Sequence, residues 1–284
     1  MKKIRRAFTL VEMLVAVTVL VLIMALCSQM VFISSLTWKR GKARADAFTK
    51  ARGMLGLIER DIQAAVLRPD LAAFADEDGR PACAFYTRLA GVPDATVSGT
   101  GPRDLSLVKY TVSVVTQHLQ RYELAYKFGG TLTLMLSGTA LPDLTEARPQ
   151  NVSGGVLDFQ IEFLDGTGKL QDSYVFDYNN PLADNNTRVA VLSLLMLDND
   201  GAKIAGATNS VARLAVAFSG APLAAQTHAQ YWNDIVSDPS FGQDLPAPVR
   251  SAVHVFERRV VIPAATVSGA SPSSFGPSDA GLIQ

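Results

Sequence analysis

One carboxylate in this sequence lies where an acid is costly. Glu12 begins an apolar segment in which no formal charge occurs from Met13 to Trp38, a run of 26 residues. An ionised carboxylate inside a bilayer costs roughly 2.5–3.5 kcal/mol on insertion scales, and such residues are functional candidates that need a cationic partner. The partner we predict is the free amine that cleavage before Phe8 would create.

This ion pair could form in two ways. Within one helix, the amine of Phe8 and the carboxylate of Glu12 are about one turn apart. Between subunits displaced along a filament, the amine of one can meet the carboxylate of the next. Either pairing would offset the cost of removing the carboxylate from water, and the second would also fix the axial register of neighbouring helices.

The other reactive side chains do not converge in the sequence. His118, His228 and His254 are scattered, and none lies at helical metal-binding spacing with an acid. We expect surface or sheet-edge histidines, no catalytic residues, no metal site and no cofactor, because nucleophile elbows, phosphate loops and zinc motifs are absent from the sequence. Cys27 falls within the apolar run, which leaves Cys83 without a partner for an intrachain disulfide.

Two further segments have ordinary interpretations. The sequence Asp-Asn-Asp-Gly at 198–201 begins like a calcium loop, but Asn209 stands where the closing Glu is required, so we predict a plain β-turn. Tyr231 and Trp232 fall in a predicted loop, where a core or anchoring role is favoured over an exposed contact.

Charge is unevenly spread along the 284 residues, although the formal net charge is zero. Removing residues 1–7 takes away four of the 26 basic residues and leaves 22 against 26 acidic ones. Nucleic-acid binding domains usually carry a basic surplus, so no nucleic-acid partner is expected. The length suits one large domain or two small ones.

The apolar run is long enough to cross a bilayer, since a helix needs roughly 20 such residues. Basic residues flank it on both sides, so the positive-inside rule gives only a preference for a cytoplasmic N-terminus. A signal anchor with one stray acid is the plain alternative. A cleaved secretory signal would have a shorter apolar core, and a lipoprotein signal ending at Cys27 would not place bulky Leu26 before the cysteine.

The N-terminal residues resemble the class III signal of type IV prepilins and type II secretion pseudopilins. The resemblance covers about a tenth of the chain and is carried by Arg5-Arg6-Ala7-Phe8-Thr9-Leu10-Val11-Glu12-Met13-Leu14-Val15-Ala16. It implies that a prepilin peptidase cuts between Ala7 and Phe8, that the new amine of Phe8 is methylated, and that Glu12 serves assembly. The departure is Ala7, where the family usually has Gly; a small residue still fits the cleft of the peptidase.

The helix is expected to continue past the membrane. An apolar stripe at spacings of three and four runs from Ala43 to Ala65, and Arg68-Pro69 should end the helix after Leu67. Residues 69–104 are predicted to form an irregular connection. The predicted strands then follow at 105–116, 120–128, 131–136, 156–164, 173–177, 188–197, 211–218 and 249–262. Surface loops are expected at 177–187 and 219–248.

The predicted fold class is α+β, with a long N-terminal transmembrane helix packed on an antiparallel β head as the resemblance to pilins implies. The domain prediction is a leader at 1–7, a transmembrane helix at 8–36, its soluble extension at 37–68, a periplasmic head at 69–265 and a flexible tail at 266–284.

Short motifs narrow the resemblance further. Residues 57–62 and 245–250 resemble segments of the minor pseudopilin J class, and pilin-like proteins of the Verrucomicrobial cassette protein C type look similar. The first functional hypothesis is therefore a minor pseudopilin in the inner membrane, with the prepilin peptidase and other pilins or pseudopilins as partners. The alternative is a minor pilin whose head displays an adhesive, DNA-binding or ligand-binding surface.

Overall fold

The computed structural model describes residues 9–67, 74, 76–77, 80–81, 83–88, 105–113, 116–126, 149–171, 173–177, 180 and 182–263. The predicted leader, the scissile residues, the strand predicted at 131–136 and the tail at 266–284 lie outside these residues. The chain divides into two compact units, Met1–Asp46 and Ala47–Gln284, and each is described by itself. We call the second unit the head.

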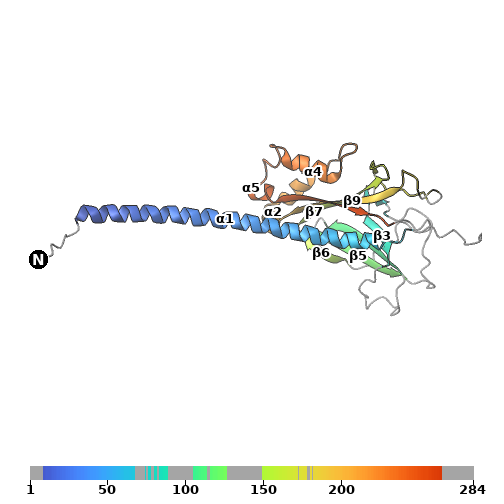
Figure 1. The fold of residues 1–284 in the computed structure, drawn as a ribbon, viewed down its shortest axis with the longest axis horizontal. Coiled ribbons are helices and arrows are strands. Elements are labelled where there is room, and N and C mark those ends of the chain that lie inside the picture. Colours follow the sequence, from blue (N-terminus) through green and yellow to red (C-terminus); the bar gives the residue numbers. More distant parts are fainter. Residues whose placement is uncertain are drawn as a thin grey trace, which may run out of the picture. The chain divides into compact units, whose positions relative to one another are not determined.

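Helix α1 covers Leu10–Gln63 and thus contributes to both units (Figure 1). It ends four residues before Leu67, where the sequence predicted its end. Beyond Gln63 the backbone pairs with residues 86–87 and no longer continues the helix. Val66 N donates to the Tyr86 carbonyl at 2.7 Å, and Ala65 forms a β-bridge with Thr87. Proline chemistry therefore does not set this helix end.

The first sheet of the head has the order β3-β4-β5-β6 and is antiparallel throughout. Its strands are Cys83–Thr87, Leu105–Ser113, His118–Tyr126 and Gln150–Gly154. Strand β3 corrects the prediction of an irregular connection at 69–104, in which the hairpin of β1 (Asp76–Glu77) and β2 (Arg80–Pro81) also falls. All five residues of β3 are buried, so the strand lacks the polar alternation that would have indicated it.

The second sheet has the order β10-β9-β7-β8 and is also antiparallel. Its strands are Val156–Asp165 (β7), Leu170–Gln171 (β8), Thr187–Leu197 (β9) and Val253–Val261 (β10). Both faces of β9 are buried, which accounts for its continuous Val and Leu sequence. Residues 173–177, predicted as a strand, are not in a strand.

Four short helices lie between β9 and β10. They are α2 (Asn199–Ala207), α3 (Ser210–Ala217), α4 (His228–Ser237) and α5 (Ala247–Arg250). These helices correct three predictions: the strand at 211–218 is α3, the loop at 219–248 contains α4 and the start of α5, and the turn at 198–201 is the start of α2. The side chain of Asp198 caps α2 by accepting from Gly201 N at 2.7 Å.

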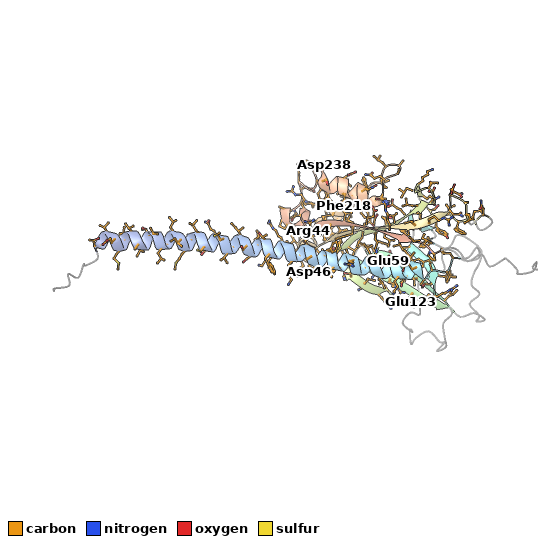
Figure 2. All side chains as sticks on the ribbon, in the orientation of Figure 1. Arg44, Asp46, Glu59, Glu123, Phe218 and Asp238 are labelled. Atoms are coloured by element: carbon orange, nitrogen blue, oxygen red, sulfur yellow. The ribbon has the colours of Figure 1, made fainter. Side chains whose placement is uncertain are left out.

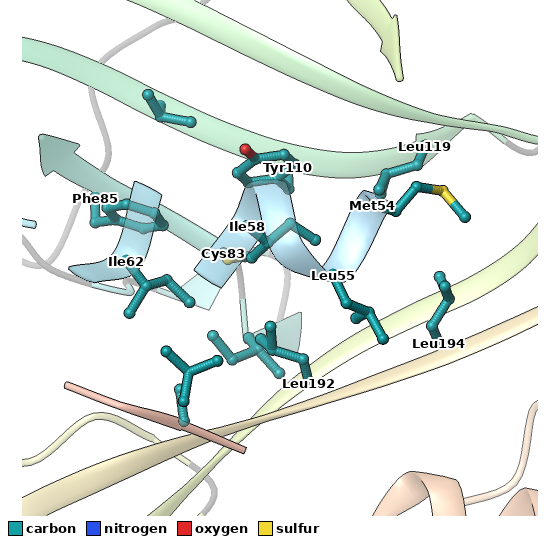
Figure 3. Packing of buried hydrophobic residues seen from close by; sticks show 14 of the residues in the cluster. Met54, Leu55, Ile58, Ile62, Cys83, Phe85, Tyr110, Leu119, Leu192 and Leu194 are labelled. Carbon is teal, nitrogen blue, oxygen red and sulfur yellow. The ribbon is translucent and has the colours of Figure 1, made fainter. Parts of the chain in front are cut away.

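The head has two main hydrophobic cores, one on each face of the second sheet. In the first core, the apolar side of α1 packs between Tyr110 and Leu119 of one sheet and Leu192 and Leu194 of the other (Figure 3). In the second core, α2–α5 cover the opposite face around the fully buried Trp232. The predicted α+β arrangement of a long apolar helix followed by antiparallel sheets is confirmed.

Candidate functional site

Glu12 lies in the first turn of α1 and belongs to a reciprocal cap. The backbone N–H of Thr9 and its hydroxyl both donate to Glu12 Oε2 at 3.1 Å, while Glu12 N donates to Thr9 Oγ1 at 3.2 Å. Thr9 is the residue immediately before the helix, and Glu12 is its third residue. This geometry is a capping box, which satisfies backbone donors that a helix N-terminus otherwise leaves unpaired.

The cap uses only part of the Glu12 carboxylate. Backbone N–H groups and the helix dipole both stabilise negative charge at a helix N-terminus. Because Thr9 engages only Oε2, the second oxygen of Glu12 is free of hydrogen bonds to any residue that the structure describes. The carboxylate can therefore hold its own helix end and still accept one further cation.

The side chains around this carboxylate are apolar and uncovered. Every residue from Thr9 to Lys42 is exposed, including the large side chains of the first five turns (Figure 2). A row of uncovered Leu, Val, Ile and Met of this length does not persist in water, so lipid or other helices must cover it. By length and composition, α1 is able to cross a membrane.

The residues predicted for processing are not described by the structure. Ala7 and Phe8 lie just before the described residues. Thr9, in contrast, was missed by the sequence analysis. Its signal was present, because Thr-x-x-Glu before an apolar run is the sequence pattern of a capping box.

At its other end, α1 enters the head with a buried acid. Asp61 is fully buried, and its Oδ2 accepts from Tyr110 Oη at 2.7 Å and from Arg121 Nε at 2.8 Å. Arg121 also bonds to Glu123 at 2.5 Å, so one guanidinium bridges two carboxylates. We call Asp61, Tyr110, Arg121 and Glu123 the buried clasp. It ties α1 to the neighbouring strands β4 and β5.

Burial and the Asp61 charge alter the acid–base behaviour of the clasp. Desolvation, together with the nearby carboxylate, raises the pKa of the Tyr110 phenol. Desolvation alone would lower the pKa of Arg121, but its hydrogen bonds to Glu123 and Asp61 outweigh that effect and raise it. The Cys83 thiol, buried beside the clasp, also has a raised pKa because of its burial and the Asp61 charge. The clasp therefore contains one fixed cation and a neutral phenol.

The histidines are separated in the fold as in the sequence. His228, at the start of α4, faces Glu162 with Nδ1 3.0 Å from Oε1, and its backbone N–H also donates to that carboxylate. His254 lies 3.9 Å from Asp198. In the described ranges, no three His, Cys, Asp or Glu side chains gather as metal ligands.

Comparison with known proteins places one family model on the chain. Residues 2–28 match the prokaryotic N-terminal methylation motif, which includes Phe8, Thr9 and Glu12. The match covers the residues that form the capping box and supports a type IV pilin or pseudopilin-like protein. No similar sequence is found among curated proteins.

Proposed function

We propose that this chain is a minor pseudopilin, a structural subunit of a type II secretion or type IV pilus-like filament. In this proposal a prepilin peptidase removes residues 1–7, the amine of Phe8 is methylated, and α1 carries the subunit into the filament. The observation that carries the proposal is Glu12: a capped carboxylate with one unused oxygen, at the start of an uncovered apolar helix and within the methylation motif.

In this proposal, the Glu12 carboxylate has no α-ammonium partner before cleavage, and cleavage makes assembly possible. The precursor has no α-amine beside Phe8, because that nitrogen is in a peptide bond. Cleavage creates a cation there, and the unused oxygen of Glu12 on a neighbouring subunit can accept it. Leaving lipid for a bundle of helices gains no hydrophobic energy, so this ion pair and close helix packing must supply the specificity.

In this proposal, the C-terminal part of α1 couples the head to filament assembly. The residues Ala47–Gln63 are held by the first core and by the buried clasp, and the ion pair between Glu59 and Arg258 adds a further tie to β10. An axial displacement of this helical segment would therefore carry the head with it. In the proposed topology, the N-terminus is cytoplasmic and the head is periplasmic in the inner membrane.

The test is removal of the Glu12 charge. Glu12→Gln and Glu12→Ala should leave membrane insertion and cleavage intact but reduce entry into filaments. The expected reduction is about tenfold for each 1.4 kcal/mol of ion-pair energy that is lost. The measurement is the share of subunits that are recovered in sheared or cross-linked filaments. Thr18→Ala is the control. Thr18 is a polar residue of the same helix, and its hydroxyl donates only to the backbone carbonyl of Val15.

Normal filament entry of both Glu12 variants would rule out the pairing. Mass spectrometry of the mature N-terminus provides an independent check, since it should begin at N-methylated Phe8. An intact Met1 in a cell with an active prepilin peptidase would contradict the processing step.

The alternative, a displayed binding head, has one observation in its favour. Val216 of α3 is 75% exposed and Leu223, in the segment that follows, is 77% exposed. Two large apolar side chains this exposed are candidates for a contact surface. Val216→Ser with Leu223→Ser should reduce adhesion or ligand binding by intact cells if this alternative holds, and should leave filament entry unchanged.

A further inference from the structure

The apolar run of α1 is followed at once by a dense group of basic residues. Lys39, Arg40, Lys42 and Arg44 occupy four of six consecutive positions, and all four are exposed. We call these four residues the basic collar. Among the residues that the structure describes, no acidic side chain lies within ion-pair distance of the collar.

The collar covers more than half of the helix circumference, an arc of about 200°, and is not confined to one narrow side. With 3.6 residues per turn, Arg40, Arg44 and Lys42 lie about 100°, 140° and 300° around the axis from Lys39. A neighbouring subunit would contact one side of α1 and leave part of this charge unpaired. A layer of headgroups surrounds a membrane-spanning helix completely, so it is the partner that fits the distribution.

The position along the helix also agrees with a headgroup layer. The 26 uncharged residues from Met13 to Trp38 span about 39 Å as a helix, which exceeds the ~30 Å hydrocarbon core. Trp38 is 76% exposed at the end of this run, and tryptophan favours the membrane–water interface. The collar begins at the next residue, where long basic side chains can reach phosphate groups.

The rest of the chain has the opposite charge. Of the 26 basic and 26 acidic residues, residues 1–44 contain eight and one, so residues 45–284 contain 18 basic and 25 acidic residues. Their net formal charge is therefore 18 − 25 = −7. An anionic surface repels this part of the chain, so attraction to such a surface at this end of the apolar run must come from the collar.

We propose that the basic collar binds the phosphate headgroups of anionic phospholipids in the leaflet at the Trp38 end of the apolar run. The proposal rests on the proposed function only in that α1 spans a bilayer. The bound headgroups hold the subunit in the membrane before assembly, and its entry into a filament requires their release. Anionic lipid in that leaflet then sets how readily a subunit leaves the membrane.

The test compares two lipids by the fluorescence of Trp38 in the full chain. The protein is reconstituted in phosphatidylcholine vesicles that contain either brominated phosphatidylglycerol or brominated phosphatidylcholine, since bromine quenches a nearby indole. Trp232 is buried in the head core and supplies a constant background. Wild type should be quenched more strongly by the anionic lipid, and added salt should weaken this preference.

Two sets of substitutions distinguish the effect of the collar on lipid preference from the effect of the total charge of the protein. Lys42→Gln should reduce the anionic preference by about fivefold, the effect of one basic residue at a charged membrane surface. The quadruple variant K39Q/R40Q/K42Q/R44Q should abolish it. The matched control R52Q/K169Q/K203Q/R250Q removes four exposed charges of the head and should behave as wild type. Because the leader is present in every protein, its four charges do not affect the comparison.

The outcomes distinguish this proposal from the proposed function. An anionic preference that persists in the quadruple variant, or is missing from wild type, overturns the collar proposal. Loss of filament entry by a quadruple variant that keeps its lipid preference would assign the collar to a neighbouring subunit and also overturn it. If neither brominated lipid quenches Trp38, α1 is outside the bilayer and the proposed function fails with it.

Discussion

At the scale of single residues, the capping box joins two roles in one side chain. Glu12 completes the N-terminus of α1 through Oε2 and keeps Oε1 for a cation. Thr9 orients the carboxylate, so it is a positioning residue for the proposed ion pair. The cost of an acid in lipid marks Glu12 in the sequence, whereas only a spacing of three residues before Glu12 marks the Thr9 hydroxyl that holds it.

The first prediction concerns Thr9. Thr9→Ala removes the hydroxyl that serves the cap in both directions, and loss of an N-cap costs about 1 kcal/mol. The amide of Glu12, which donates to this hydroxyl, should then exchange with solvent about fivefold faster in detergent micelles, as measured by NMR. Thr18→Ala, whose hydroxyl bonds only to the Val15 carbonyl, is the control. Unchanged exchange in Thr9→Ala would show that the cap contributes nothing to the helix start.

The second prediction concerns pH and the buried clasp. The pKa values of Cys83 and Tyr110 are raised above their ordinary values of 9.0 and 10.0, chiefly by burial. Both groups thus keep their protons in the folded state and lose them at alkaline pH only on unfolding. The free energy of unfolding contributed by these groups is therefore fully present below pH 9 and falls as the pH rises above it.

Chemical denaturation of the detergent-solubilised protein between pH 8 and pH 11 measures this slope. Tyr110→Phe removes one of the two groups, so its slope above pH 10 should be shallower than that of wild type. An identical slope in wild type and variant would mean that the Tyr110 phenol ionises as easily in the fold as in the unfolded chain.

At the scale of elements, α2 is placed by one close approach. A Cβ added at Gly201 would lie 2.1 Å from Ala252 Cβ, which no real contact allows, whereas a Cβ at Gly206 in the same helix would meet nothing within 4 Å. The helix can approach the turn before β10 only because position 201 has no side chain.

This pair of glycines provides the third prediction. Gly201→Ala should destabilise the head by about 1–3 kcal/mol, since overpacking displaces α2 from its neighbour. Gly206→Ala should be neutral or stabilise it by up to about 1 kcal/mol, because alanine is the better helix former. Chemical denaturation of both variants in detergent gives the comparison. Equal stabilities would contradict the close approach at Gly201.

The elements that the sequence predicted correctly have a strong period or length. The apolar run of α1 and the alternating strands β4, β5 and β7 are of this kind. The misassigned elements depend on tertiary contacts. Residues 211–218 consist mostly of Val, Ala and Leu, which fit a strand as well as a helix, and their helical state is stabilised where Leu214 joins the second core. Strand β3 forms because it pairs with β4 and captures the end of α1.

The Glu12 site, in contrast, depends on residues that are close together in the sequence. Thr9 and Glu12 are three positions apart in the sequence, so their contact depends on local helix geometry alone. The buried clasp was not predictable, because Asp61 and Arg121 are sixty positions apart and meet only through the packing of α1 on the first sheet. In the sequence, Asp61 lies beside the charged residues Glu59 and Arg60, off the apolar stripe, and no local pattern indicates its burial.

At the scale of the whole molecule, the proposed cleavage would change which charged groups one subunit presents to another. A subunit cleaved in this way would carry both halves of the proposed pair: an amine at Phe8 and a carboxylate at Glu12. An uncleaved subunit would carry only the carboxylate, and a cleaved Glu12→Ala subunit would carry only the amine. If the pair forms between subunits, these two defective forms are complementary. If it forms within one helix, neither can repair the other.

The last prediction uses this complementarity. Ala7→Leu should block cleavage, because the resemblance to prepilins requires a small residue before the scissile bond, and the uncut subunit then keeps Glu12 without an amine. Two differently tagged subunits, Ala7→Leu and Glu12→Ala, are expressed together and recovered from membranes after cross-linking. Random association gives twice as many mixed pairs as either like pair, and we expect the mixed pair to exceed this baseline by about tenfold for each 1.4 kcal/mol of ion pairing. Mixed pairs at this random baseline would instead place the amine and the carboxylate within one helix, and the filament would then need another source of axial register.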